Sequence, residues 1–165
     1  MTLSLAVLGF VTLQRLAELV IARRNTRALL ARGGQERGAG HYPAMVALHA
    51  AWLAGLWILA WDRPVSLPLL ALFALLQLGR VWVLATLGGR WTTRIIVLPG
   101  ETLVRRGPYR FLSHPNYVVV AAEIAVLPLA FGQAFYAVLF TLLNGAMLYV
   151  RLREESRALR EAAPA

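Results

Sequence analysis

Residues 67–88 read LPLLALFALLQLGRVWVLATLG, an apolar run that a single charged residue, Arg80, interrupts. A helix that crosses a bilayer needs about 20 mainly apolar residues, and this run has that length. Other apolar runs occupy residues 2–22, 43–61 and 133–150, and a shorter one occupies residues 116–131. The sequence therefore predicts an all-α integral membrane protein with about five transmembrane helices.

The last two apolar runs are separated by residues that disfavour a continuous helix. Pro128 and the pair Gly132–Gln133 lie between them, and such residues are typical of a tight turn. We therefore expect a C-terminal helical hairpin. The N-terminus lacks the basic start of a signal peptide and is interpreted as the first span. The whole chain, residues 1–165, is interpreted as one membrane-embedded domain.

The composition supports a membrane protein and limits the chemistry. Hydrophobic residues make up 59% of the chain, whereas soluble domains average about 45–50%. The sequence contains no cysteine, which excludes disulfides, thiolate catalysis and cysteine-based metal sites. The three histidines have no short spacing of the kind that binds metals, so we predict no metal site.

All 17 basic residues are arginines, and the formal net charge is +9. In a soluble protein this charge would suggest a nucleic-acid partner. Here the arginines lie mostly between the apolar runs, which indicates a signal for membrane orientation and no nucleic-acid partner. The arginine-rich segments are residues 23–42, 89–115 and 151–165. The positive-inside rule places these three in the cytoplasm and the N-terminus outside.

The 89–115 loop is the one long connection with signs of internal order. Residues 94–107 read RIIVLPGETLVRRG, with β-branched residues on both sides of a Pro-Gly turn signal. This pattern is compatible with a small β-hairpin. An irregular basic loop is an equally good interpretation, and the sequence leaves both open.

Ionisable residues inside membrane spans are costly and point to function or to pairing. Arg15 and Glu18 are three residues apart and are expected to pair on one helix face. Glu123 and Arg80 have two interpretations: an ion pair with each other, or direct contact with a substrate. His49, inside the second run, is expected to be a hydrogen-bonded packing residue.

Two polar clusters are expected at the same cytoplasmic edge of the membrane. One is GPYRFLSHPNYV, residues 107–118, at the start of the fourth run. The other is RLREESRALRE, residues 151–161, which is expected to continue the fifth helix beyond the membrane. Pro115 suits the first turn of a helix, so the first cluster is also compatible with a simple helix start. Surface ion pairs along the second would contribute little stability.

Together these clusters resemble the isoprenylcysteine carboxyl methyltransferase family of integral-membrane enzymes. The family pattern is G-x-Y-x-x-x-R-H-P-x-Y, then an apolar hairpin, then R-x-x-x-E with a second acidic residue beside it. The resemblance covers roughly residues 70–160 and is strongest to small bacterial members. Ser113 stands where the family commonly has Arg, and Arg110 is a candidate to replace that charge. The longer C-terminal extension of the eukaryotic members is absent from this sequence.

The resemblance implies S-adenosylmethionine as the methyl donor, bound in a cytoplasmic pocket. It implies catalytic roles for three residues: Arg151, Glu155 and His114. It implies that the cofactor is held by Tyr109, Arg110, His114, Pro115, Asn116, Tyr117 and Glu154. Aromatic faces such as those of Tyr109 and Tyr117 attract cations, and the sulfonium of the donor is one.

The resemblance also implies a lipophilic acceptor that enters from the bilayer and is methylated on a hydroxyl or carboxylate oxygen. Candidates are an alkylpyrone, another phenolic lipid or an isoprenylcysteine. Some small bacterial members are associated with type III polyketide synthases, which implies a possible functional link to such an enzyme. The expected location is the bacterial inner membrane.

Two other functions fit parts of the pattern. Membrane reductases of the sterol-reductase type carry a similar HPNY segment and bind NADPH, but they are longer than this chain. A non-catalytic membrane scaffold would use the HPNY segment as a helix cap and the tail as a solvated helix. Stabilisation by S-adenosylhomocysteine or by NADPH would separate these possibilities.

Overall fold

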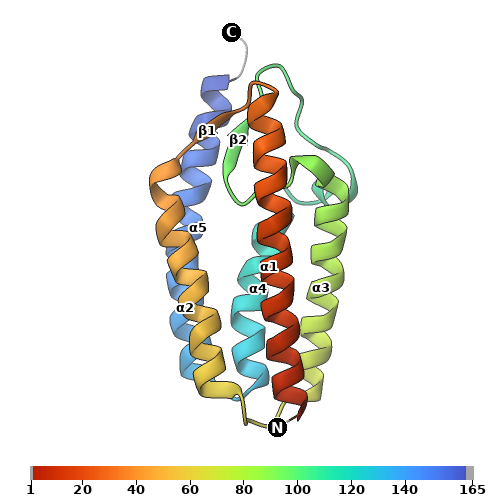
Figure 1. The fold of residues 1–165 in the computed structure, drawn as a ribbon, viewed down its shortest axis with the longest axis vertical. Helices are drawn as coiled ribbons and strands as arrows, with labels where there is room; N and C mark the ends of the chain where they lie inside the picture. Colours follow the sequence, from red (N-terminus) through yellow and green to blue (C-terminus); the bar gives the residue numbers. More distant parts are fainter. Residues whose placement is uncertain (1, 163–165) are drawn as a thin grey trace.

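The computed structural model describes residues 2–162 and is a bundle of five long helices (Figure 1). The helices are α1 (Thr2–Ala31), α2 (Tyr42–Ala60), α3 (Leu67–Leu87), α4 (Pro115–Ala130) and α5 (Ala134–Ala162). Four of them are long and apolar enough to cross a membrane, and α4 is a shorter apolar helix. The prediction of an all-α membrane protein is therefore confirmed.

Two helices extend well beyond the apolar runs that predicted them. Helix α1 has 30 residues and continues past residue 22, and α5 has 29 residues. At 1.5 Å per residue each is about 45 Å long, longer than the roughly 30 Å hydrocarbon core. Both helices therefore reach out of the membrane at the same end of the bundle, where Figure 1 shows their ends near the C-terminus. The tail does continue the fifth helix, as expected from the sequence.

Helices α4 and α5 form the expected hairpin, and its turn depends on Pro128 and Gly132. The amide of Gln133 donates to the carbonyl of Pro128 at 2.9 Å, and the amide of Gly132 donates to Leu129 at 2.9 Å. Gly132 has φ of 72°, in the left-handed region that other residues rarely adopt. The turn reverses the chain within three residues, so α5 packs along α4.

A two-stranded antiparallel sheet joins the first two arginine-rich segments, residues 23–42 and 89–115. Strand β1 (Gln35–Arg37) pairs with β2 (Ile95–Val97), with Glu36 opposite Ile96. The hairpin interpretation of residues 94–107 is therefore wrong in its pairing. The strand exists and a turn follows it, but residues 101–104 are irregular. The backbone of β2 is hydrogen-bonded to the distant β1 instead. An ion pair between Arg94 and Glu36, at 2.5 Å, also links the two segments.

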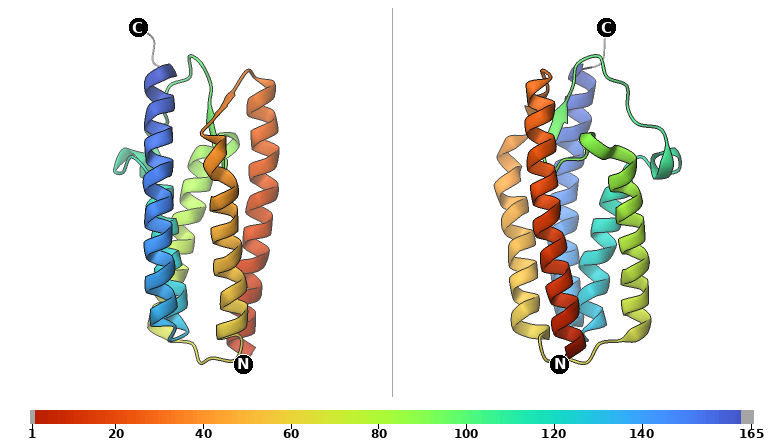
Figure 2. Two further views of the ribbon diagram at one scale, coloured as in Figure 1. Left: turned by 90° about the vertical axis from the view of Figure 1, so that its left-hand side faces the viewer. Right: turned by 45° about the vertical axis from the view of Figure 1, so that its right-hand side comes forward.

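Three short 3₁₀ helices connect the longer elements: η1 (Ala39–His41), η2 (Gly88–Arg90) and η3 (Gly107–Arg110). Figure 2 shows η3 outside the outline of the bundle, beside the end of α3. A Cβ at Gly107 would lie 2.4 Å from Oγ1 of Thr86, so the backbone of η3 lies directly against the last turn of α3. Gly107 also has φ of 58°. Glycine is thus required here for both space and conformation.

The main apolar core lies toward the end of the bundle that carries the N-terminus. It contains large buried side chains from α1, α2 and α4, among them Trp52, Leu56, Ile124 and Leu127. Helices α2 and α5 approach so closely that a Cβ at Gly55 would clash with the hydroxyl of Tyr136. That hydroxyl donates to the carbonyl of Trp52 at 2.9 Å. His49 bonds the carbonyl of Met45 at 2.8 Å and packs as predicted.

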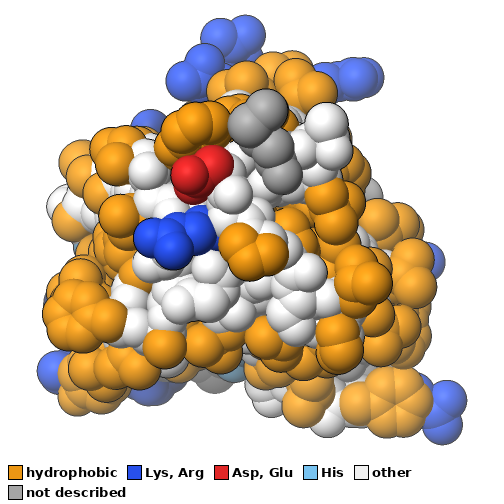
Figure 3. Space-filling view, turned by 90° about the horizontal axis from the view of Figure 1, so that it is seen from below, with side chains coloured by type: hydrophobic (Ala, Val, Ile, Leu, Met, Phe, Trp, Pro, Cys, Tyr) orange, Lys and Arg blue, Asp and Glu red, His pale blue; other side chains and the backbone are white. Residues whose placement is uncertain are grey.

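The two ends of the bundle differ strongly in charge. The three arginine-rich segments lie together at one end, where α1 and α3 finish and α4 begins. At the other end, the turn between α2 and α3 contains only Asp62 and Arg63 as charged residues. Figure 3 shows this end, where hydrophobic and uncharged surfaces surround a few charged side chains. This asymmetry is the pattern that the positive-inside rule describes.

Candidate active site

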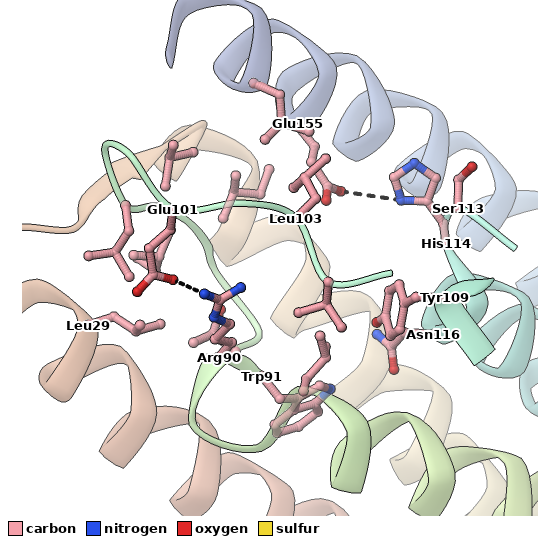
Figure 4. A pocket seen from close by; sticks show the side chains of 18 of the residues that line it. Leu29, Arg90, Trp91, Glu101, Leu103, Tyr109, Ser113, His114, Asn116 and Glu155 are labelled. Carbon is pink, nitrogen blue, oxygen red and sulfur yellow. Dashed lines mark ion pairs between the residues drawn. The ribbon is translucent and has the colours of Figure 1, made fainter. Parts of the chain in front are cut away.

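A cavity of about 760 Å³ opens at the arginine-rich end of the bundle. Its walls come from the end of α1, the segment between α3 and α4, the first turn of α4, and the part of α5 beyond the membrane. Figure 4 shows Glu155 reaching from α5 toward His114, with Tyr109 and Asn116 facing the same space. Six predicted site residues besides Glu155 line it: Tyr109, Arg110, His114, Asn116, Tyr117 and Arg151. The structure therefore brings seven of the predicted site residues to one cavity.

The start of α4 supplies one wall. His114 is the N-cap residue, and Pro115 occupies the first turn, as its fixed φ favours. The rings of His114 and Tyr117 stack with centroids 5.2 Å apart and planes 6° apart. Oδ1 of Asn116 is buried and has no hydrogen-bond partner within residues 2–162. A buried acceptor without a partner is costly, so this atom is a candidate contact for a bound ligand.

A chain of hydrogen bonds links α4 to α5. Nε of Arg151 donates to the hydroxyl of Tyr117 at 2.8 Å, and that hydroxyl donates to Oε2 of Glu155 at 2.5 Å. The guanidinium also lies 5.5 Å from the centre of the Tyr117 ring. Because charge-assisted hydrogen bonds are short and directional, this chain fixes the position of the Glu155 carboxylate at the cavity.

Arg151 is itself held from behind by groups that the sequence did not indicate. Its Nη1 donates to the backbone carbonyl of Thr93 at 2.7 Å and contacts the sulfur of Met45 at 3.1 Å. The side chain is buried, with 7% of its surface exposed. Arg151 therefore links α5 to three other parts of the chain: the 89–115 segment, α2 and α4. A backbone carbonyl has no sequence signature, so the role of Thr93 could not be found from residue types.

The remaining polar groups differ in their exposure. His114 is half-exposed, and its Nδ1 lies 3.8 Å from Oε2 of Glu155 (Figure 4). Burial, with a smaller contribution from the Glu155 charge, raises the pKa of Tyr109 to about 12. Tyr109 is therefore a neutral hydroxyl at neutral pH and can donate a hydrogen bond into the cavity. Nε1 of Trp91, another lining residue, is buried without a partner in the described chain.

Ion pairs fasten the irregular segment that covers the cavity. Glu101 pairs with both Arg32, at the end of α1, and Arg90, in η2. Nη1 of Arg90 also donates to the carbonyl of Thr102 at 2.9 Å. Figure 4 shows the Arg90–Glu101 pair on the side of the cavity opposite Glu155. Glu101 was not among the predicted site residues, and its neighbours in sequence do not reveal its distant partners.

Two of the residues implied by the resemblance are not among the residues that line the cavity. Pro115 is buried within the first turn of α4. Glu154 lies against Gly38. A Cβ atom added to Gly38 would be 3.0 Å from the Cβ of Glu154. Successive residues of a helix are rotated by about 100°, so Glu154 and Glu155 face different neighbours.

Arg80 and Glu123 form an ion pair deep in the bundle, and neither lines the cavity. Nε of Arg80 donates to Oε1 of Glu123 at 2.8 Å, and Gln77 donates to the same oxygen at 2.8 Å. Both charged side chains are almost fully buried, at 2% and 0% exposed. The geometry thus matches the ion-pair interpretation of these residues.

Arg15 and Glu18 of α1 complete this cluster. Arg15 pairs with Glu18 at 2.9 Å, as predicted, and with Glu123 at 2.7 Å. Glu18 also pairs with Arg80 at 3.1 Å. Two arginines and two glutamates therefore neutralise one another where α1, α3 and α4 meet. Such closed pairing is the condition under which charges are tolerated in a membrane.

Comparison with known proteins gives a consistent result. Residues 69–161 match the isoprenylcysteine carboxyl methyltransferase family. The chain is 36% identical to the uncharacterized protein YpbQ of Bacillus subtilis over 94% of its own length and 95% of that protein. It is 28% identical to an uncharacterized protein of Haemophilus influenzae over 91% of each chain. No solved structure matches it significantly.

The matched region contains the helical hairpin and every cavity residue that the resemblance implied. It also spans the segment from the end of α3 to α4, which covers the cavity. The family implies methyltransferase activity at a membrane. On the fold, the site and these matches, the chain belongs to the isoprenylcysteine carboxyl methyltransferase (ICMT) family.

Proposed function

We propose that this protein is an S-adenosylmethionine-dependent O-methyltransferase that acts on a lipophilic acceptor. The observation that carries the proposal is the Arg151–Tyr117–Glu155 chain, which holds one carboxylate at the edge of a cavity. That cavity lies where the apolar helices end, so a polar cofactor and a membrane-borne acceptor have access to the same space.

The residues present fit the cofactor. Pockets for such ligands have volumes of about 300–1,000 Å³, and this one has about 760 Å³. Asn116 offers an unpaired hydrogen-bond acceptor and Trp91 an unpaired hydrogen-bond donor. S-adenosylmethionine contains both amino and carboxylate groups, which could pair with them. The Tyr109 ring and the stacked pair His114–Tyr117 provide aromatic surface for a cation.

The bound cofactor supplies an activated methyl group, and the protein supplies position and proton transfer. Holding donor and acceptor in line is the main catalytic contribution in such a displacement. Glu155 and His114 are the groups near the cavity that would accept a proton from a hydroxyl acceptor. Arg151 would hold Glu155 in place through the Tyr117 hydroxyl, because Arg151 is itself fixed by its bonds to Tyr117, Thr93 and Met45.

We infer the orientation and the acceptor class from the charge and the location of the cavity. The arginine-rich end would face the cytoplasm, with the N-terminus outside, in the inner membrane of a bacterium. The acceptor would carry a long apolar tail that stays in the bilayer while its oxygen enters the cavity. Alkylpyrones, other phenolic lipids and isoprenylcysteines have this form, and a polyketide synthase would be a source of the first two.

The proposal can be tested with purified protein in detergent. We expect S-adenosylhomocysteine to raise the melting temperature and NADPH to leave it unchanged. Membranes containing the protein should transfer a labelled methyl group to a lipid-extractable acceptor, identified by mass spectrometry. If S-adenosylhomocysteine has no effect and no methyl group is transferred, the proposal is rejected; stabilisation by NADPH would favour a reductase.

A matched pair of variants tests the role of the carboxylate. Glu155→Gln should abolish methyl transfer, whereas Glu161→Gln, an exposed glutamate paired with Arg157, should not. If Glu155→Gln still binds S-adenosylhomocysteine, Glu155 serves the acceptor; if binding is lost, it serves the donor. Unchanged methyl transfer in Glu155→Gln would contradict the assignment.

A further inference from the structure

Residues 103–112, here called the η3 loop, project sideways from the bundle at the level where α3 ends (Figure 2). The contact of Gly107 with Thr86 holds this loop against the last turn of α3. Helix α3 is one of the candidate membrane spans, so its last turn marks the edge of the hydrocarbon region. The loop therefore lies at the height of the lipid headgroups.

The η3 loop exposes large apolar side chains. Phe111 is 72% exposed, Leu103 is 62% exposed and Leu112 is 48% exposed. Most other exposed large apolar residues of the described chain lie on the long helices, where lipid would cover them. In water, a cluster of this kind in a loop is unfavourable and marks a contact surface. At the membrane edge, the acyl chains of the bilayer would cover it.

Three exposed arginines accompany these side chains: Arg105, Arg106 and Arg110. None of them has an ion-pair partner within residues 2–162, and the η3 loop contains no acidic residue. The nearby Glu101 is already paired with Arg32 and Arg90. The guanidinium of Arg110 lies 6.0 Å from the centre of the Phe111 ring. The loop therefore combines an apolar anchor with uncompensated positive charge.

We propose that the η3 loop is an interfacial binding site for anionic phospholipids. Phe111 and Leu112 enter the upper acyl region, and Arg106, which does not line the cavity, contacts the phosphates of the headgroups. Apolar anchors with adjacent basic residues are the combination that binds segments to anionic bilayers. A soluble acidic partner would satisfy the charge but would not cover the exposed apolar side chains of Phe111 and Leu112.

The opposite side of the same loop forms part of the cavity wall. Arg106, Phe111 and Leu112 are not among the lining residues, whereas the cavity is lined by Leu103, Val104, Arg105, Tyr109 and Arg110. The loop thus separates the bilayer from the cavity, and bound lipid would fix the position of that wall. Lipid binding by the loop does not depend on the identity of the reaction, so its test stands apart from the test of methyl transfer.

The depth of the loop can be measured with a spin label. The chain has no cysteine, so a nitroxide attached to a single introduced cysteine reports one position. We would compare Phe111→Cys with Leu75→Cys, exposed on α3, and with Arg157→Cys, exposed on the tail. In proteoliposomes, the ratio of oxygen to aqueous nickel-complex collisions at 111 should lie between the high ratio at 75, within the span, and the low ratio at 157. A ratio equal to that at 157 would overturn the proposal.

The lipid specificity requires a second measurement. Binding of labelled phosphatidylglycerol to the protein in nanodiscs of phosphatidylcholine should be weaker in Arg106→Gln by about fivefold, the effect of one basic residue near an anionic surface. Arg160→Gln removes the same charge from the tail and should change binding little. Equal losses in both variants would overturn the proposal, as would full competition by inorganic phosphate alone.

Discussion

The substitution Glu123→Gln should strongly destabilise the protein. Each Glu123 oxygen accepts two hydrogen bonds, from Arg80 and Gln77 at one and from Arg80 and Arg15 at the other. In Glu123→Gln, one of these oxygens is replaced by an amide NH₂ group. At either position, two N–H donors then face a group that is itself a donor. Losing two bonds to charged groups, at about 1.5–3 kcal/mol each, gives a cost of roughly 3–6 kcal/mol. Breaking a buried ion pair by removing one partner has a similar typical cost.

The free energy of unfolding can be measured by equilibrium denaturation in mixed micelles. Glu161→Gln, on the exposed tail, is the matched control and should change stability by less than about 1 kcal/mol. The double variant Arg80→Met, Glu123→Leu leaves the neutral pair Arg15–Glu18. It should be more stable than Glu123→Gln, because no charge is left without a partner.

Two results would refute this reasoning. A loss below about 1 kcal/mol in Glu123→Gln would mean that the cluster is solvated. A double variant as unstable as the sum of its single variants would mean that Arg80 and Glu123 are not coupled. S-adenosylhomocysteine should still stabilise the Glu123→Gln protein, because neither residue of the pair lines the cavity. Selective loss of that effect would favour a direct role at the site.

Two further predictions concern the cavity wall and η3. Tyr117→Phe removes the hydroxyl that positions Glu155; a lost hydrogen bond of about 1.4 kcal/mol predicts a roughly tenfold lower kcat, and unchanged kcat would contradict it. Gly107→Ala places a side chain on a left-handed backbone and against Thr86, so it should lower the free energy of unfolding by more than about 2 kcal/mol. Gly100→Ala, where the backbone is also left-handed but the surrounding space is open, should lower it by about 1–2 kcal/mol. Thermal unfolding of the two glycine variants measures the difference, and equal losses would show that η3 does not pack closely on α3.

Local patterns in the sequence predicted where the helices lie, although α1 continues to Ala31, beyond the apolar run that ends at residue 22. Span boundaries at residues 43–61 and 67–88 agree with α2 and α3 to within one residue. The hairpin followed from Pro128 and Gly132, which restrict the backbone wherever they occur. The shortness of α4 agrees with the sequence, because the apolar run at residues 116–131 is shorter than the other four.

The partners of individual groups were harder to predict. The sequence left a local hairpin and an irregular loop equally open for residues 94–107, but strand β2 pairs with β1, some 60 residues away. Glu154 and Glu155 are adjacent in an acidic motif, yet they face different sides of α5. Both outcomes depend on which surfaces the packed helices bring together, and a local pattern contains no information on that.

The sequence by itself determined that the chain is a helical membrane protein with one strongly basic end, because composition and length decide how a segment partitions between water and lipid. The family resemblance also pointed to seven of the residues that line the cavity. Only the tertiary structure decided that Arg151 is held by the carbonyl of Thr93 and that four charges of α1, α3 and α4 form one neutral cluster. Hydrogen bonds and ion pairs between distant residues depend on distance and direction in space, which are set when the helices pack.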